Sequence, residues 1–327
     1  MKVLVTGGTG FIGYNLVKEL KNQGHDVTCL IRQSSKTRWL QSLGNISFVT
    51  GDLLAFDTLI PAVQDVDWII HLAGVVTAVS REQYFRVNHF GTRNLIRAVA
   101  THHPGIQKFI YISSLAAGGP TRIGQPRTEE MSDRPITHYG ESKRAAEIAL
   151  TEFQSQLPLV IIRPPVVYGP RDTGVLTFFK SIQQGWQIQF TGEDLYLSLI
   201  YVEDLVEGIL ALAEHDIPSG EMFYINDQYQ YSMDQIQTMI AQALEVDTRK
   251  LRVPRMLLYP IAGISELVNR ARKKPSYLNL QKIKEITQPA WICSSDKLTK
   301  YTGFHARYSL PDGAHRTAEW YQSHGWI

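Results

Sequence analysis

The sequence has little cysteine and no strong charge of either sign. Its two cysteines, Cys29 and Cys293, lie far apart and form no CxxC pair, which fits a reducing compartment. The 33 basic and 31 acidic residues leave a formal net charge of +2, which argues against nucleic acid as the principal partner. The histidines, His71 and the pair His102–His103 among them, show no paired ligand spacing, so we predict no metal site.

Long hydrophobic runs are also missing. No apolar run reaches the ~18 residues that a membrane-spanning helix needs, so we expect no membrane partner. Met1 leads directly into the first predicted strand, so we expect no signal peptide and a cytoplasmic location. The 327 residues, 44% of them hydrophobic, suffice for a large α/β domain or for a nucleotide domain with a smaller lobe.

A glycine-rich turn follows the first apolar run, 3–5, and precedes a helical pattern that begins near Leu16. Glycine there lets the chain turn sharply, lets backbone N–H groups approach a pyrophosphate and lets the helix pack close to the strand. The amino end of the helix adds free N–H donors and a positive dipole. We predict a dinucleotide phosphate site formed by Gly7, Gly10, Phe11, Ile12 and Gly13.

Short apolar segments alternate with helical patterns through the first half of the chain. The further predicted strands are 27–31, 46–50, 68–72, 109–113 and 159–163. This alternation is typical of βαβ units, and it predicts an α/β fold with a doubly wound parallel sheet of the Rossmann type.

The alternation stops after Pro164, where helical patterns are separated by loops rich in proline, glycine and tyrosine. We therefore predict a nucleotide-binding domain over 1–165 and a smaller lobe, mainly for substrate binding, over 166–327. Segments near 195–215 are expected to return to the first domain.

Tyr139 and Lys143 stand four residues apart in a predicted helix, which places them on one face. An ammonium group beside a phenol favours the phenolate and lowers the pKa of the tyrosine. Such a tyrosine exchanges a proton with a hydroxyl or carbonyl oxygen near neutral pH. Ser114 follows a predicted strand, at the edge where α/β sheets bind ligands, and its hydroxyl is expected to bond the same oxygen.

With these motifs in this order, the chain resembles the extended short-chain dehydrogenase/reductase family over nearly its whole length. The resemblance rests on TGGTGFIG at 6–13, Gly51-Asp52-Leu53, His71-Leu72-Ala73-Gly74, Val87-Asn88 with Gly91-Thr92, Ser113-Ser114, Tyr139 to Lys143, and Arg163-Pro-Pro-Val-Val-Tyr-Gly-Pro.

The resemblance implies roles for individual residues. Ser114, Tyr139 and Lys143 would be the catalytic residues, and Lys143 would also hold the nicotinamide ribose. Asp52 and Leu53 would contact adenine, Ala73 and Gly74 the ribose and nicotinamide, and Val166 the carboxamide; Leu72, Asn88 and Pro164 complete the predicted cofactor positions. Members of the family often dimerise through the helices near 88–100 and 139–153, so a homodimer is an expectation here.

The residue after the second strand favours NADP over NAD. NAD enzymes usually carry an acid there for the ribose 2′-hydroxyl, but this chain has Arg32, with Lys36 and Arg38 nearby. A guanidinium suits a 2′-phosphate, whereas the two later basic residues also fit a solvated loop.

The reaction type follows from two departures. Leu115-Ala116-Ala117 stand where the dehydratases of the family often carry an acid pair, and Pro164-Pro165 stand where epimerases often carry an asparagine. The first departure disfavours a dehydratase and the second resembles the reductase branch, so we predict hydride transfer between NADP(H) and a carbonyl or alcohol carbon. A nucleotide-sugar epimerase is the alternative, and a non-catalytic dinucleotide sensor is the second alternative.

An apolar segment, 256–268, is flanked by Arg252 and Arg255 and then by Arg270, Arg272, Lys273 and Lys274. We interpret it as a lobe helix that packs on the core and has a solvated basic end. The alternatives to this interpretation are a lid over an apolar substrate and a membrane-surface helix. Pro260 and Gly263 argue against a continuous amphipathic helix.

Overall fold

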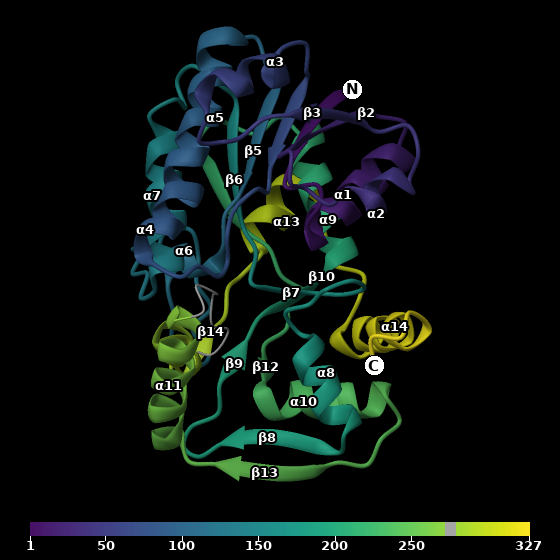
Figure 1. The fold of residues 1–327 in the computed structure, drawn as a ribbon, viewed down its shortest axis with the longest axis vertical. Coiled ribbons are helices and arrows are strands. Elements are labelled where there is room, and N and C mark those ends of the chain that lie inside the picture. Colours follow the sequence, from purple (N-terminus) through teal and green to yellow (C-terminus); the bar gives the residue numbers. More distant parts are fainter. Residues whose placement is uncertain (272–278) are drawn as a thin grey trace. The chain divides into compact units, whose positions relative to one another are not determined.

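The computed structural model describes residues 1–271 and 279–327 (Figure 1). The chain divides into two compact units. The first unit comprises Met1–Ala117, His138–Arg163 and Val206–Phe223, and the second comprises Gly118–Thr137, Pro164–Leu205 and Tyr224–Ile327. The two units have different architectures.

A seven-stranded parallel sheet forms the centre of the first unit, in the order β11-β6-β5-β4-β1-β2-β3. The strands are β1 (Lys2–Thr6), β2 (Asp26–Ile31), β3 (Ser47–Thr50), β4 (Trp68–His71), β5 (Lys108–Ile112), β6 (Leu159–Arg163) and β11 (Glu221–Tyr224). The predicted doubly wound Rossmann fold is confirmed. The order reverses between β1 and β4, and ligands of such sheets bind beyond the carboxyl ends of the strands at this position.

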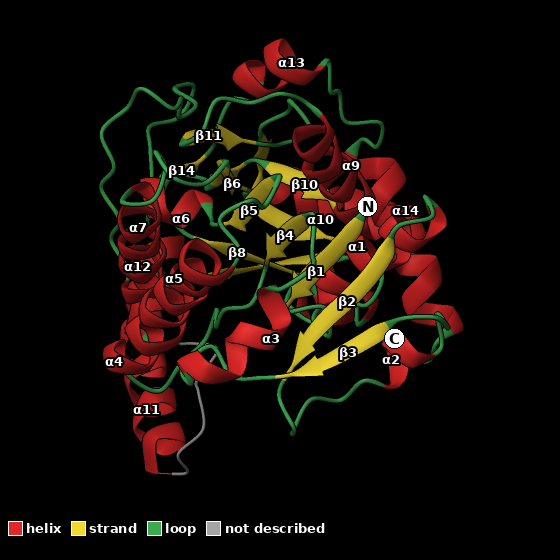
Figure 2. Ribbon diagram, turned by 90° about the horizontal axis from the view of Figure 1, so that it is seen from above, coloured by secondary structure: helices red, strands yellow, loops and turns green. Residues whose placement is uncertain are grey.

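Helices cover both faces of this sheet (Figure 2). Leu95, Ile96 and Val99 of α5 are fully buried against the sheet because they recur at helical spacing. The helical elements are α1 (Phe11–Asn22), α2 (Arg38–Gln41), η1 (Phe56–Leu59), α3 (Ile60–Val63), α4 (Arg81–Tyr84), η2 (Phe85–Gly91), α5 (Thr92–His102), α6 (Leu115–Gly118), α7 (His138–Thr151) and α9 (Val202–Glu214). The segment η2 is a π-helix, a form that often marks functional sites.

Several small sheets replace the single large one in the second unit. β7 (Val166–Tyr168) pairs with β10 (Leu199–Tyr201), and β8 (Trp186–Phe190) pairs with β13 (Arg249–Val253). β9 (Tyr196–Leu197) lies between β12 (Tyr231–Ser232) and β14 (Ala290–Trp291). The helices are α8 (Leu176–Gln183), α10 (Met233–Ala243), η3 (Arg255–Leu257), α11 (Leu258–Ala271), α12 (Leu280–Ile286), α13 (Asp296–Thr302) and α14 (Leu310–Ser323), and their apolar faces include Phe179, Ile240 and Tyr321.

The expectation that Pro260 and Gly263 would interrupt a helix is wrong. Helix α11 is continuous from Leu258 to Ala271. Pro260 is its third residue, where the backbone N–H has no acceptor within the helix, so proline costs no hydrogen bond there. Arg272, Lys273 and Lys274 lie outside the described residues. Among the described helices, none is both long and apolar enough to cross a membrane.

Candidate active site

The glycine turn after β1 is too tightly packed to accept side chains. Gly7 has φ of 75°, and a Cβ there would lie 2.7 Å from the backbone nitrogen of Ala73. A Cβ on Gly13 would lie 2.2 Å from the carbonyl oxygen of Gly7. The turn therefore requires glycine at both positions, first for the positive φ and then for the close approach of α1 to the loop.

The amino end of α1 has the properties of a phosphate site. Its N-cap is Gly10, which offers no side-chain acceptor, and the first turn contains no acidic residue. The first backbone N–H groups of a helix have no intrahelical partner, and they favour an anion. The turn and the helix thus fit a dinucleotide pyrophosphate.

A buried histidine lies where the strand order reverses. The His71 Nδ1 atom lies 2.6 Å from the Thr6 hydroxyl, and Nε2 lies 2.9 Å from the Thr92 hydroxyl. Desolvation, together with the positive charge of Lys143, lowers the pKa of His71 to about 3. His71 is therefore neutral at physiological pH and joins β1, β4 and α5.

The three predicted catalytic residues all belong to the first unit. Ser114 follows β5, while Tyr139 and Lys143 lie on α7. The Lys143 ammonium nitrogen lies 2.7 Å from the carbonyl oxygen of Ile112, the last residue of β5. The side chain of Lys143 therefore reaches the carboxyl edge of the sheet at Ile112, which precedes Ser114 by two residues.

Lys143 is buried beside an aromatic ring and is influenced by a nearby carboxylate. Its Nζ lies 4.3 Å from the centre of the Tyr111 ring. Desolvation lowers the pKa of Lys143 to about 7, and the carboxylate of Glu147 opposes that shift. With a pKa of about 7, Lys143 can gain or lose its proton near neutral pH, and nearby charges shift that equilibrium.

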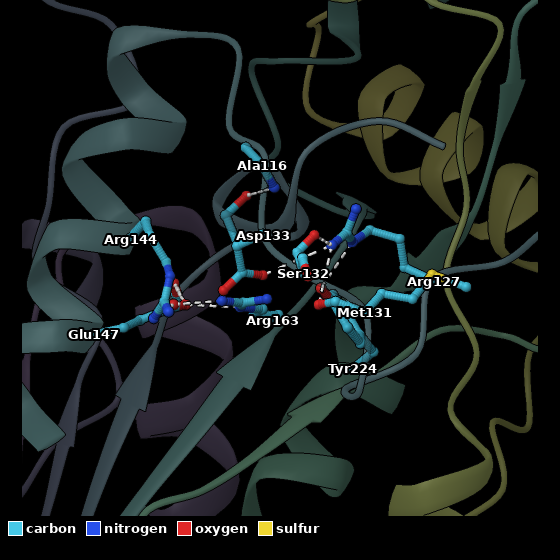
Figure 3. Close-up of polar contacts among 11 residues, drawn as sticks. Ala116, Arg127, Met131, Ser132, Asp133, Arg144, Glu147, Arg163 and Tyr224 are labelled. Carbon is cyan, nitrogen blue, oxygen red and sulfur yellow. Dashed lines mark hydrogen bonds and ion pairs between the residues drawn. The ribbon is translucent and has the colours of Figure 1, made fainter. Parts of the chain in front are cut away.

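The sequence analysis missed a buried ion pair beside Lys143. Glu147, one helical turn further along α7, accepts hydrogen bonds from Arg163 Nε at 2.8 Å and Nη2 at 2.5 Å (Figure 3). The Ser113 hydroxyl donates to the same carboxylate at 2.5 Å, and Arg144 lies 3.4 Å away. The two-pronged geometry holds α7 against the ends of β5 and β6. The available signal was the acid at i+4 from Lys143.

Asn88 fastens the loop that follows β4. Its Oδ1 accepts the Val75 N–H at 2.8 Å, and its Nδ2 donates to the Val75 carbonyl at 3.0 Å and to the Ser142 hydroxyl at 2.9 Å. A Cβ on Gly74 would lie 3.0 Å from that Oδ1. The amide of Asn88 thus shapes the loop of Ala73 and Gly74, and its direct contact with cofactor stays a prediction.

The remaining predicted cofactor residues occupy several loops. Arg32 is exposed directly after β2, and Asp52 Oδ1 accepts the Leu54 N–H at 2.9 Å. Leu53 is buried, and its carbonyl accepts a hydrogen bond from Asn94. Pro164 and Val166 belong to the second unit. The cofactor contacts of these residues, of Leu72, and of Phe11 and Ile12 at the start of α1 stay predictions.

Comparisons with known proteins place this geometry among enzymes. A model of the NAD dependent epimerase/dehydratase family matches residues 3–225. "Ceramide reductase" of Caulobacter vibrioides is 28% identical over 327 residues, covering 99% of this chain and 96% of that protein. A Mycobacterium tuberculosis "3 beta-hydroxysteroid dehydrogenase/Delta 5-->4-isomerase" is 31% identical over 271 residues, 77% of this chain and 72% of that one.

A third relative and a solved structure complete the comparison. "UDP-glucose 4-epimerase" of Vibrio cholerae is 29% identical over 285 residues, covering 82% of this chain and 84% of that protein. The crystal structure of gox2253 is similar over 99% of both chains, with a TM-score of 0.82 and 27% identity.

Proposed function

This chain belongs to the NAD dependent epimerase/dehydratase family and is an enzyme of the extended short-chain dehydrogenase/reductase type, and from that premise we propose that it is an NADP-dependent oxidoreductase acting on a carbonyl or alcohol. One observation carries the proposal: α7 presents Tyr139 and Lys143 one turn apart, with the Lys143 ammonium bonded to the carbonyl of Ile112 at the end of β5, the strand that Ser114 follows. A phenol, an ammonium and a hydroxyl gathered at this edge fit proton transfer to a carbonyl oxygen.

The first unit offers the groups that a dinucleotide needs. The free N–H groups of α1 would hold the pyrophosphate, and the loop of Ala73 and Gly74 would line the nicotinamide ribose. Lys143 Nζ lies 4.0 Å from the position of a Cβ on Gly74, so it is within reach of a ribose on that loop. When bound, the nicotinamide supplies or accepts the hydride.

Tyr139 is the proposed acid and base. In reduction its phenol donates a proton to the carbonyl oxygen, while the Ser114 hydroxyl donates a hydrogen bond that orients the same oxygen. The Lys143 ammonium stabilises the phenolate that remains. Desolvation lowers the pKa of Lys143 to about 7, and the Glu147 carboxylate opposes this shift. Glu147 therefore favours the charged ammonium.

Arg32 supports the choice of NADP. Its side chain is exposed at the end of β2, where the adenosine ribose of a dinucleotide lies in this type of fold. A guanidinium there recognises a 2′-phosphate through charge-assisted hydrogen bonds. The family description covers NAD, and the preference for NADP is our proposal.

We propose an apolar ketone or alcohol as the substrate class. Two of the relatives are named for a ceramide and for a 3β-hydroxysteroid, which are large apolar molecules. Pro164 and Pro165 follow Arg163, so the asparagine that the resemblance links to nucleotide diphosphates is missing. We further propose that 166–327 mainly bind this substrate and that the protein works in the cytoplasm.

The test is a substrate panel with both nicotinamide cofactors. Oxidation of NADPH with an apolar ketone, and little change with UDP- or dTDP-sugars, is the expected result. A thermal-shift panel adds a binding readout, because a ligand at about 100 times its Kd stabilises a protein by ~2.7 kcal/mol. If only nucleotide sugars raise the melting temperature, the reductase proposal is wrong.

A nucleotide-sugar epimerase is the second candidate, because one relative is named UDP-glucose 4-epimerase. Such an enzyme would interconvert sugars without net oxidation of cofactor. Cofactor binding without turnover on either class of substrate would instead favour a dinucleotide sensor.

A further inference from the structure

The second unit carries an exposed apolar surface that the proposed chemistry does not use. We call it the ribbon patch, and it comprises Trp186, Ile188, Leu251, Met256, Leu257 and Ile261, which lie on β8, β13, η3 and the start of α11. Trp186 is 45% exposed and Met256 is 76% exposed. Side chains of this size are normally covered, and a cluster of them marks a binding surface.

The register of the ribbon puts three of these side chains together. β8 and β13 run parallel (Figure 1). Ile188 lies opposite Leu251, and Trp186 lies opposite Arg249. Alternate residues of a strand share a face, so Trp186, Ile188 and Leu251 line one face of the ribbon. The intervening Gln187 is buried and bonds Thr248 at 2.8 Å, which fixes the opposite face inward.

Helix α11 extends the same surface. Leu258 and Ala262 are buried and pack with Ile283 and with Phe190, which follows Ile188 on the same face of β8. Leu257 and Ile261, also four residues apart, flank this buried stripe and remain about half exposed. The apolar face therefore continues from the ribbon onto the side of α11.

The patch is bordered by positive charge. The stretch from Thr248 to Ser265 contains four basic residues and no acidic one. Lys250 is paired with Asp234 at 2.6 Å, and Arg255 bonds the carbonyl of Glu193. Arg249 and Arg252 are both exposed. Arg249 stands opposite Trp186 and shares the face of the patch, whereas Arg252 stands opposite Gln189 on the other face of the ribbon. The border therefore has charge to offer to an anionic partner.

We propose that the ribbon patch docks on an anionic phospholipid surface, with the apolar side chains in the interface and Arg249 at the headgroups. Tryptophan and aliphatic side chains beside arginine are the composition of segments that lie in a membrane interface. A second copy of the chain fits less well, because a twofold contact would bring the two copies of Arg249 close together. The proposal departs from the expectation of no membrane partner, and it is independent of the proposed reaction.

Vesicle co-sedimentation of the full chain tests the proposal. We expect binding to phosphatidylcholine vesicles that contain phosphatidylserine, little binding to phosphatidylcholine alone, and weaker binding at high salt. Arg249→Gln should weaken partitioning about fivefold, and Arg252→Gln, on the other face of the ribbon, should weaken it less. Ile188→Ser combined with Leu257→Ser should weaken it roughly tenfold or more. These positions are exposed, and circular dichroism verifies that each variant is folded.

Matched controls come from the first unit. Val76→Ser removes an exposed aliphatic group and Lys18→Gln removes an exposed charge, so both should bind vesicles as the wild type does. Brominated lipid gives a second readout, because Trp186→Phe should keep binding but lose most of the tryptophan quenching. The proposal is overturned if the wild type binds neither lipid or both equally, if the controls lose as much binding as the patch variants, or if the patch variants change self-association in sedimentation velocity rather than lipid binding.

Discussion

The two units of this chain are built around different kinds of sheet. The first has one parallel sheet, in which each strand end delivers a residue to the same edge: Thr6 from β1, His71 from β4 and Ile112 from β5. The second has sheets of two or three strands, and β9 pairs with strands that come well over thirty residues later. A continuous parallel sheet gathers chemistry at one edge, whereas small sheets leave exposed ribbons such as β8 and β13.

Among buried basic and carboxyl groups, the two units also differ in the kind whose pKa is shifted most clearly: basic groups in the first unit and a carboxyl group in the second. In the first unit, desolvation lowers the pKa of His71 to about 3 and of Lys143 to about 7, so both basic groups are pushed toward neutrality. In the second, desolvation raises the pKa of the Asp227 carboxyl to about 7, although the Tyr231 hydroxyl donates to it at 2.9 Å. Lowering the pH therefore disfavours the folded state through His71 in the first unit and favours it through Asp227 in the second.

If the first unit holds the acid and base, removing one phenol oxygen there should nearly abolish turnover. Tyr139→Phe keeps the ring that packs 6.3 Å from Tyr84, so cofactor binding should persist while turnover falls by about 10²–10⁴. Steady-state kinetics and nucleotide titration measure the two effects. Tyr111→Phe is the control, since it keeps the ring beneath Lys143 and should retain turnover. Near-normal turnover of the Tyr139 variant would place the proton donor elsewhere.

The buried ion pair of the first unit should contribute more than any surface pair. Glu147→Gln removes a buried carboxylate charge that is paired with the buried Arg163, so we expect a loss of about 3–5 kcal/mol in the free energy of unfolding. Glu141→Gln, on the same helix but only partly buried and paired with the exposed Arg81, should cost less than about 1 kcal/mol. Urea unfolding compares them, and similar losses would mean that burial does not distinguish these carboxylates.

Opposite pH slopes should separate the units directly. Below pH 6.5 the unfolded chain protonates His71 while the folded chain does not, so His71 makes the free energy of unfolding fall as pH falls toward 3. Asp227 keeps its proton in the folded chain up to about pH 7 but loses it above pH 4 when unfolded, so it makes that energy fall as pH rises.

Two variants test these slopes between pH 4.5 and 6.5. Relative to the wild type, His71→Gln should remove a positive slope and Asp227→Asn a negative one, each of up to about 1.4 kcal/mol per pH unit. Urea unfolding at three pH values gives the slopes. Changes of the same sign in both variants would contradict the contrast between the units.

A smaller effect is expected at the edge of the first unit. Arg32→Ala should weaken NADPH by roughly 1.5–3 kcal/mol, because a charge-assisted contact is lost, and leave NADH nearly unchanged. Titration of both nucleotides into wild type and variant measures this. Lys36→Ala serves as the control, since Lys36 also fits a solvated loop. Equal affinities of the wild type for both nucleotides would refute the preference.

Much of the first unit could be predicted because its constraints are local. The glycines at 7, 10 and 13 and the four-residue spacing of Tyr139 and Lys143 are visible in short windows, and the strands were predicted to within a residue or two. The Glu147–Arg163 pair could not be found this way, because it requires β6 to lie against α7. The edge strand β11 is no shorter than β3 or β4, but it lies after the part of the chain in which strands and helices alternate, so no neighbouring βαβ pattern indicates it.

The second unit was harder for a related physical reason. Its strands are two to five residues long, and their partners are distant in sequence, so neither periodicity nor turn residues specify the pairing. The continuity of α11 was missed because Pro260 was judged as an interior residue rather than as one of the first turn. The basic and apolar composition of 249–261 was visible, but only the register of β8 and β13 shows which residues share a face.

The π-helix Phe85–Gly91 has a consequence for how this chain can change length. Its wider turn sets the angular position of Asn88 toward Val75 and Ser142 on one side and of Thr92 toward His71 on the other. Deleting one residue would rotate everything after it by about 100° about the helix axis and separate these two sets of contacts. Insertions and deletions should therefore be tolerated far less between 85 and 92 than substitutions at the exposed positions of the same segment.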